Sequence, residues 1–364
     1  MPVDVPISGL QARAYIIPTD EPESDGTLQW DSTTLIVATA QAGGQTGLGW
    51  TYGHAALAQV IDTDLAEAIT GLSATDVPMA ATAMAAALRN SGRPGMGSMA
   101  IAAVDIALWD LKAKLLSVPL AELLGRVHTR VPAYGSGGFT SYSDRRLRDQ
   151  LSGWAAQGFG MVKLKIGREP SRDPQRLAIA RDAVGPDVRL FADANGAFHP
   201  AEAIAMSREL ADAGVVWFEE PVSSDDLEGL HEVRSAAPAG MAVAAGEYGD
   251  ELFYFRRMLD AQAVDVLQAD VTRCAGITQL QRIDALCRAR SRPLSLHCSP
   301  TIHANVAVAL ETVVHIEYFH DHASIEHKLF EGAATATDGL LYPNLDMPGH
   351  GAVFRWSDAE PYAR

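Results

Sequence analysis

The sequence lacks the features that mark several classes of protein. It has no run of basic side chains, and its 45 acidic residues against 29 basic ones give a formal net charge of −16. A nucleic-acid-binding protein needs lysines and arginines against the phosphates, so we expect no nucleic acid partner. The most apolar window, residues 99–109, is interrupted by Asp105 and is about half the length that spans a bilayer. We therefore expect no membrane partner.

Cysteine is also scarce. Cys274, Cys287 and Cys298 are an odd number and do not have the spacing of metal ligands. The first ten residues lack the basic and apolar regions of a secretory signal. We interpret the cysteines as reduced thiols and predict a cytoplasmic protein.

Short apolar runs alternate with segments of helical periodicity from about residue 130 onward. This alternation predicts βα units around a parallel sheet whose strands are covered on both faces. Seven runs end in a charged or polar residue, 20 to 28 residues apart: Lys165, Asp193, Glu219, Glu247, Asp270, His297 and Glu317. With an earlier strand at 131–137, the pattern predicts an eight-stranded (β/α) barrel with catalytic groups at the carboxyl ends of its strands. An open doubly wound sheet is the alternative, but it would place its ligand at a single switch point.

The remaining segments suggest three parts. Residues 1–128 predict a separate α+β capping domain, because residues 35–53 indicate two strands joined by a turn and residues 75–125 are rich in helix formers. We assign residues 129–330 to the barrel and residues 331–364 to a tail that packs back on the capping domain.

Residues 18–26, PTDEPESDG, form a polar stretch between the first strand and the next. We expect a loop without core residues, either a mobile lid or a disordered surface loop.

Two lysines, Lys163 and Lys165, alternate along one predicted strand, so both ammonium groups lie on one face, about 7 Å apart along the chain. Like charges repel there, and we expect Lys163 to lower the pKa of Lys165 toward that of a working base. The next three strands end in Asp193, Glu219 and Glu247. Carboxylates that converge on one barrel mouth need a cation among them, and an all-oxygen set favours Mg²⁺.

Two further residues lie beside this set. Asn195 points the same way as Asp193 and either orients a ligand or substrate or is an ordinary loop asparagine. Glu220 is the alternative ligand, but strand parity with Trp217 favours Glu219.

His297 follows the strand next to the one that ends in Asp270, and neighbouring strands lie about 5 Å apart. The carboxylate can then accept a hydrogen bond from the imidazole and fix its tautomer. Glu317, one strand further, is an additional acid, either at the mouth or capping a helix. A lysine pair, a metal site and a His–Asp pair together suit removal of the proton next to a carboxylate.

With these residues in place, the chain resembles the mandelate racemase subgroup of the enolase superfamily over nearly its whole length. The resemblance rests on the segment 100–125, the Lys-x-Lys motif, the three carboxylates, the Asp270/His297 pair and Glu317, in that order and spacing. It implies an α+β capping domain on a modified (β/α)₇β barrel, and a symmetric homo-oligomer.

The resemblance also implies roles. Mg²⁺ is expected on Asp193, Glu219 and Glu247, with Lys165 as one acid/base and Lys163 touching the carboxylate of a small-molecule substrate. His297, paired with Asp270, is expected to be the acid/base on the opposite face, and Glu317 to hydrogen-bond a carboxylate oxygen. Relatives similar to muconate cycloisomerase or dipeptide epimerases carry a lysine where this chain has Asp270, so their reactions are disfavoured.

Dehydration of an aldonate or aldarate is the predicted reaction, because it is the commoner activity among relatives with this set. A racemase or epimerase of an α-hydroxy acid shares the first step and is the alternative. A non-catalytic structural role is the remaining alternative.

Candidates for substrate contacts are harder to find. Trp50, Tyr52 and His54 either face the substrate or pack within the capping domain, and Tyr134 and Ser136 are weaker candidates. Four histidines resemble a metal tract, but we expect them to be solvated or packed: His315, His320, His322 and His327. The contact of His350, in a PGHG segment where relatives commonly have PGLG, is left open.

Overall fold

The apolar runs from residue 131 onward form eight parallel strands that close into a barrel. In the computed structural model, which describes residues 5–364, these strands follow one another around the ring, and the last pairs with the first. They are β4 (Val131–Gly137), β5 (Met161–Lys165), β6 (Arg189–Asp193), β7 (Val215–Glu219), β8 (Ala242–Ala245), β9 (Val266–Ala269), β10 (Leu294–Leu296) and β11 (Val313–Phe319).

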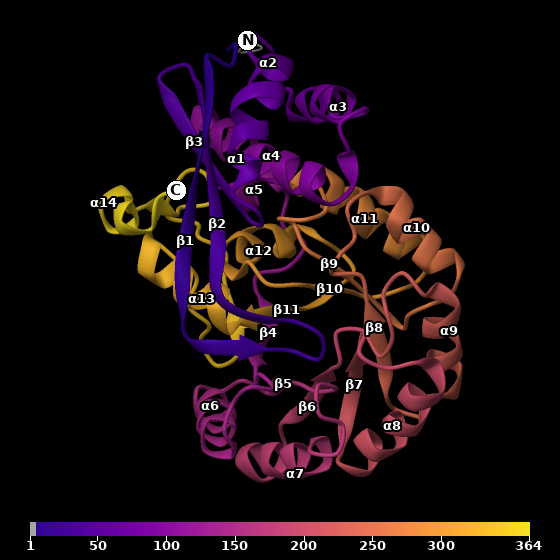
Figure 1. Cartoon of the computed structure of the whole chain (residues 1–364). Coiled ribbons are helices and arrows are strands. Elements are labelled where there is room, and N and C mark those ends of the chain that lie inside the picture. The colour runs from indigo at the N-terminus through magenta and orange to yellow at the C-terminus, as the bar shows by residue number, and fades with distance from the viewer. Residues whose placement is uncertain (1–4) are drawn as a thin grey trace.

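A helix follows each of the first seven barrel strands. These helices are α6 (Asp144–Ala156), α7 (Asp173–Val184), α8 (Pro200–Asp212), α9 (Leu227–Ala236), α10 (Leu252–Asp260), α11 (Ile277–Ala289) and α12 (Pro300–Val306). In Figure 1, α6 to α11 lie outside the ring of strands. The predicted (β/α)₇β fold class is therefore confirmed.

A layer of aromatic rings fills the barrel interior. Tyr134, Phe191 and Trp217 belong to one buried cluster, and the rings of Phe191 and Trp217 stack at 5.1 Å. Asp193 and Glu219 lie two positions after Phe191 and Trp217 on the same strands, so they point to the same side of the sheet. The aromatic layer thus closes the barrel beneath the polar strand ends.

An antiparallel sheet with helices forms the amino-terminal part of the chain. Its strands are β1 (Gly9–Ser24), β2 (Gln29–Ala42) and β3 (Gln45–Tyr52), in that order. The helices are α1 (Ala56–Val60), α2 (Ala66–Ile69), α3 (Val77–Ala87), α4 (Ser98–Leu116) and α5 (Leu120–Leu124). A Cβ on Gly47 of β3 would lie 2.1 Å from the carbonyl oxygen of Ala107 in α4. Glycine therefore lets the helix lie directly on the sheet.

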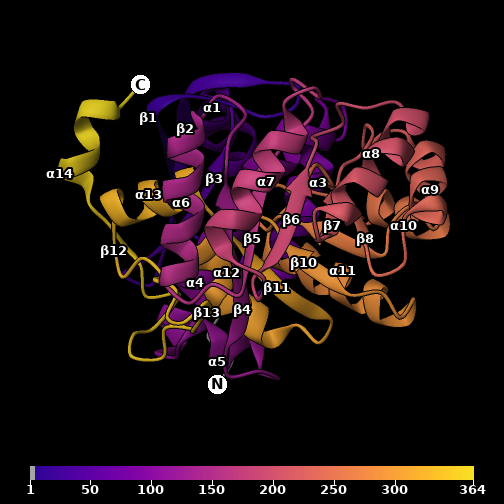
Figure 2. The ribbon, with the colours of Figure 1, turned by 90° about the horizontal axis from the view of Figure 1, so that it is seen from below.

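Residues 18–26 are not the loop without core residues that the sequence predicts. Strand β1 continues to Ser24, with a register shift between Pro18 and Glu23, and pairs with β2 as a long hairpin. Glu23 and Ser24 are buried, and the hydroxyl of Thr140 donates to the carbonyl of Asp25 at 2.9 Å. Figure 2 shows the β1–β2 hairpin passing over one end of the barrel. Contacts distant in sequence cover these polar residues, which local composition does not reveal.

The chain after β11 connects the barrel with the amino-terminal sheet. Its elements are α13 (His320–Leu329), β12 (Phe330–Glu331), β13 (Leu340–Leu341), β14 (Val353–Phe354) and α14 (Trp356–Ala359). Strand β13 pairs with β4, and the backbone N–H of Arg364 donates to Ala14 in β1. His350 Nε2 donates to the carbonyl of Leu48 at 2.8 Å, which gives this histidine its contact. No helix within residues 5–364 is both long and apolar enough to cross a membrane.

Candidate active site

The polar strand ends meet at the end of the barrel that the β1–β2 hairpin covers. A pocket of about 490 Å³ opens there between the barrel and the amino-terminal sheet. Six residues predicted from the sequence line it: Tyr52, His54, Lys165, Asn195, Glu247 and His297.

The two lysines of β5 lie among carboxylates. Lys163 is fully buried, and its Nζ contacts Glu219 Oε1, lies 2.8 Å from Glu317 Oε1 and 3.4 Å from Asp193 Oδ2. Lys165 Nζ lies 2.5 Å from Asp193 Oδ2. The acids therefore supply the counter-charges that two adjacent ammonium groups require.

The expected lowering of the Lys165 pKa is wrong for this arrangement. Burial and the charge of Lys163 both lower the pKa of Lys165, but the carboxylates of Asp193, Glu247 and Glu317 together outweigh them. The resulting pKa lies above the ordinary value for lysine.

Asp193, Glu219 and Glu247 form a set suited to a hard cation. One carboxylate oxygen from each lies within 4.8 Å of the others, and Glu247 Oε2 is buried without a hydrogen-bond partner. Trp217 Nε1 donates to Glu219 Oε2 at 2.8 Å, so Glu219 points into the barrel as its parity predicts. Burial and the charge of Asp193 raise the pKa of Glu219 to about 8. Glu220 is buried next to this set but is not part of it.

His297 and Asp270 form the predicted pair. His297 Nδ1 lies 2.8 Å from Asp270 Oδ2, while Asp270 Oδ1 accepts from the backbone N–H and the hydroxyl of Thr272, each at 2.7 Å. Nδ1 therefore carries the proton, since a carboxylate can only accept. Burial lowers the pKa of His297, but Glu247 and Glu317 outweigh it and leave the pKa above its usual value.

Glu317 is held from two sides. The hydroxyl of Ser136 donates to Glu317 Oε1 at 2.5 Å, and Lys163 contacts the same oxygen. Burial alone would raise the pKa of Glu317, but Lys163, His297 and Lys165 together hold it well below the usual range. Glu317 is thus an anion that accepts hydrogen bonds in this arrangement.

Two family models cover most of the chain. Residues 23–125 match the mandelate racemase/muconate lactonizing enzyme N-terminal domain, and residues 146–359 match the enolase C-terminal domain-like model. The chain belongs to the mandelate racemase/muconate lactonizing enzyme family of the enolase superfamily.

Known members of this family resemble the chain along its whole length. A 3,6-anhydro-α-L-galactonate cycloisomerase from Streptomyces coelicolor is 32% identical over 95% of this chain and 96% of its own. The structure of a mandelate racemase/muconate lactonizing enzyme-like protein from Rubrobacter xylanophilus is 50% identical, with a TM-score of 0.97 over 99% of this chain and 100% of that one. L-talarate/galactarate dehydratase from Salmonella typhimurium LT2, solved with Mg and L-lyxarohydroxamate, is 27% identical, with a TM-score of 0.90 over 100% of this chain and 94% of that one.

Trp50 and Tyr134, two of the candidates for substrate contacts, do not line the pocket. Trp50 is fully buried, with its ring 4.3 Å from that of Phe330 and its Nε1 donating to Glu326 Oε1 at 3.4 Å. Tyr134 lies in the aromatic layer below the mouth, 5.3 Å from Lys163 Nζ. Both rings fill apolar space that the sequence cannot distinguish from a pocket wall.

The pocket is also lined by residues that were not predicted from the sequence as substrate contacts. They include Leu28, Trp30, Thr33, Tyr248, Arg273, Cys298, Phe319, Asp321 and His322. Tyr248 and Arg273 follow Glu247 and Asp270 by one and three positions, so the rule that places function after strand ends would have found them.

The four candidate histidines separate in space. His322 lines the pocket and stacks on Tyr52 at 3.5 Å, whereas His315 lies within the barrel, 5.0 Å from the ring of Tyr134. His327 accepts or donates a hydrogen bond with Tyr318 at 2.9 Å. His315 and His322 are therefore packed side chains, whereas His320 is partly exposed and His327 lies at the surface, so the four do not form one metal tract.

Proposed function

We propose that the protein is a Mg²⁺-dependent dehydratase of an aldonate or aldarate. It would remove the proton next to the carboxylate and expel the 3-hydroxyl, which gives a 2-keto-3-deoxy acid. The observation that carries the proposal is that Lys165 and His297 line one pocket, on strands that flank the three-carboxylate set on β6 to β8. The acid-sugar substrates named for the Streptomyces and Salmonella relatives support the substrate class.

The three buried carboxylates fit the cation that this reaction requires. Asp193, Glu219 and Glu247 would hold Mg²⁺, which when bound neutralises the charge that enolisation places on the substrate carboxylate. With Asp193 holding the cation, the ion pair between Asp193 and Lys165, which contributes to the raised pKa of Lys165, would be weakened. Burial and Lys163, which both lower that pKa, then favour a neutral amine that accepts a proton.

The two acid/base groups divide the proton transfers between them. Lys165 takes the proton from the α-carbon, and the electron pair of that C–H bond moves into the carboxylate as an enediolate. When the pair returns, the bond between C3 and its oxygen breaks, and His297 donates a proton from Nε2 to the leaving oxygen. Asp270 stabilises the imidazolium that makes this donation possible.

Lys163 does not line the pocket but lies beneath it, between Glu219 and Glu317. We assign it the neutralisation of these buried acids and donation toward the substrate carboxylate from below.

Opening of a 3,6-anhydro ring is a second candidate. The same elimination takes place, but the leaving group at C3 is the ring ether oxygen, so no water is lost. The 32% identity with the Streptomyces cycloisomerase, which extends over 95% of this chain, favours this reaction. Epimerisation would follow instead if His297 returned a proton to the α-carbon.

A substrate panel tests the proposal. The protein is incubated with Mg²⁺ in D₂O with aldonates, aldarates and 3,6-anhydroaldonates, and keto acid and α-deuterium are followed by NMR. Keto acid from an open-chain sugar supports the dehydratase, and Lys165→Met should abolish it while Lys112→Met, on the capping helix α4, should not. Deuterium incorporation without keto acid would overturn the dehydratase in favour of an epimerase. The absence of both keto acid and deuterium exchange would refute enolisation. Turnover that survives a chelator would refute the need for Mg²⁺.

A further inference from the structure

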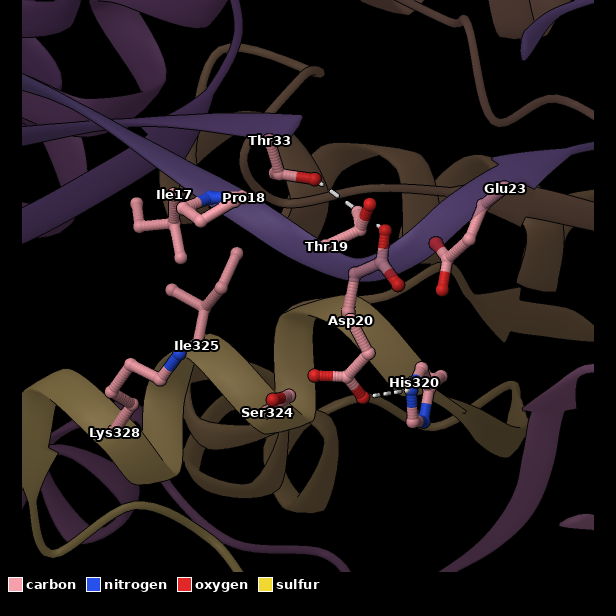
Figure 3. A pocket seen from close by; sticks show the side chains of 11 residues that line it. Ile17, Pro18, Thr19, Asp20, Glu23, Thr33, His320, Ser324, Ile325 and Lys328 are labelled. Carbon is pink, nitrogen blue, oxygen red and sulfur yellow. Dashed lines mark hydrogen bonds and ion pairs between the residues drawn. The ribbon is translucent and has the colours of Figure 1, made fainter. Parts of the chain in front are cut away.

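A second polar cluster lies beside the pocket, between the β1–β2 hairpin and the start of α13. It surrounds a cavity of about 20 Å³, which is room for one water-sized particle. In Figure 3, Asp20 and Glu23 extend from the ribbon of β1, and His320 faces Asp20 from the chain on the other side. Glu23, His320 and Asp321 each offer one ligand atom, and these atoms lie within 4.8 Å of one another.

Glu23 has a carboxylate oxygen that the protein leaves unpaired. The residue is fully buried, and its Oε1 accepts from the hydroxyl of Tyr142 at 3.2 Å, but Oε2 has no hydrogen-bond partner within the described residues. Buried polar atoms are normally paired, because an unpaired one costs about 1–3 kcal/mol. An oxygen of this kind needs either a proton shared with the neighbouring carboxylate of Asp321 or a partner that is not part of the chain.

Lys328 lines the same cavity as the carboxylates of the cluster but forms no ion pair with Glu23 or Asp321. Asp321 is buried, and its Oδ2 accepts from Trp30 Nε1 at 3.1 Å and from the Thr33 hydroxyl at 3.4 Å, which are neutral donors. Within residues 5–364, no lysine or arginine forms an ion pair with Glu23 or Asp321. Two adjacent buried carboxylates need either a shared proton or a cation between them.

His320 favours the cation. A proton shared by two carboxylates needs no third group, whereas His320 brings an imidazole nitrogen to the same cavity. Two carboxylates and one imidazole are a ligand set typical of Zn²⁺, whose fourth position is often water. The imidazole is partly exposed, with 26% of its side-chain surface accessible, which leaves the ion a route from solvent.

We propose that Glu23, His320 and Asp321 bind a second divalent cation of the Zn²⁺ type, separate from the three-carboxylate set of the barrel mouth. Ligand atoms around a tetrahedral zinc lie roughly 3.4 Å apart, so the side chains close by about an ångström on binding. The ion would fasten β1 to α13. Thr33 and Asp321 also line the substrate pocket, so this contact would fix the hairpin over the barrel mouth without touching the reacting atoms.

Zinc counting tests the site. The full-length protein is dialysed against micromolar Zn²⁺ with millimolar Mg²⁺, which occupies the three-carboxylate set, and bound zinc is measured by atomic emission. A third cluster, His297, Cys298 and Glu317, contains a thiol that also binds zinc. All proteins in this experiment therefore carry Cys298→Ala.

The parent protein should hold one Zn²⁺ per chain and gain several degrees in melting temperature on loading. Glu23→Gln and His320→Gln should each weaken zinc binding at least tenfold and remove the gain in melting temperature. Asp31→Asn makes the same change of charge at an exposed position of the same hairpin and should bind as the parent does. His320 is partly exposed, so its variant keeps the test valid even where Glu23→Gln does not fold.

Three results would overturn the proposal. One is a parent protein that binds no zinc while Glu23→Gln raises the melting temperature. This is expected if Glu23 and Asp321 share a proton, because a neutral amide would then replace the carboxyl group of Glu23. Another is zinc binding that both cluster variants retain. The third is zinc that is lost only with Asp193→Asn, which would place the ion in the barrel mouth.

Discussion

Replacement of Asp270 by asparagine should invert the tautomer of His297. Asp270 Oδ1 accepts from the backbone N–H of Thr272, a group that can only donate, so the amide oxygen of Asn must occupy this position. The amide NH₂ then faces His297 Nδ1, which in the native protein donates across 2.8 Å. Nδ1 must become an acceptor, and the proton moves to Nε2. The variant also lacks the negative charge that stabilises the imidazolium.

The size of the effect follows from the contact that is lost. A hydrogen bond to a charged group contributes about 1.5–3 kcal/mol, and about 1.4 kcal/mol corresponds to a tenfold change in rate. The lost bond alone should lower kcat roughly 10- to 150-fold, and the changed tautomer adds to this loss. KM should change little, because Asp270 does not line the pocket.

Two measurements check this prediction. Initial rates of keto acid formation give kcat and KM, and the ¹⁵N shifts of the His297 ring, assigned with a His297→Gln variant, report the tautomer without any substrate. Thr272→Val is the matched control, since it keeps the backbone N–H and the carboxylate and should keep Nδ1 protonated. An Asn variant with a protonated Nδ1 and kcat within threefold of the native value would refute the reasoning.

Three further changes test other parts of the structure. A Cβ on Gly26 would lie 2.2 Å from the carbonyl oxygen of Ala194, so Gly26→Ala should displace the tip of the β1–β2 hairpin. Steady-state kinetics should then show a KM raised several-fold and a smaller effect on kcat. Burial raises the pKa of Asp105 to about 7, above its value of about 3.9 in an unfolded chain. Folded protein then binds the extra proton, so the free energy of unfolding should fall as pH rises from about 4 to 7, and urea titrations should show a flatter dependence for Asp105→Asn. Burial also raises the pKa of the Cys298 thiol, so we expect it to stay protonated although its Sγ lies 3.2 Å from His297 Nε2. Cys298→Ala should therefore keep kcat within about threefold of the native value, and a larger loss would assign the thiol a role in proton transfer.

The barrel and its strand-end acids could be predicted because they follow from local rules. An apolar run that ends in a charged residue, repeated once per βα unit, places those residues at one mouth whatever the loops do. The buried hairpin could not be predicted in this way. Glu23 is polar and directly follows a proline. Contacts with Tyr142 and the start of α13, more than 100 residues away in sequence, bury it.

Depth along a strand is a second quantity that alternation leaves open. Alternation correctly places Lys163 and Lys165 on one face of the sheet, as it does Tyr134 and Ser136. Residues two positions apart on a strand nevertheless lie about 7 Å from each other along the strand. That distance is one layer of side chains. Lys165 therefore reaches the pocket, while Lys163 and Tyr134 lie below it. At the lower depth Lys163 meets Glu219 and Glu317 together, and the charge of two acids decides its protonation. Pairwise reasoning from a Lys-x-Lys motif sees only the repulsion between the lysines, whereas the pKa of each depends on acids supplied by the strands beside it and across the barrel.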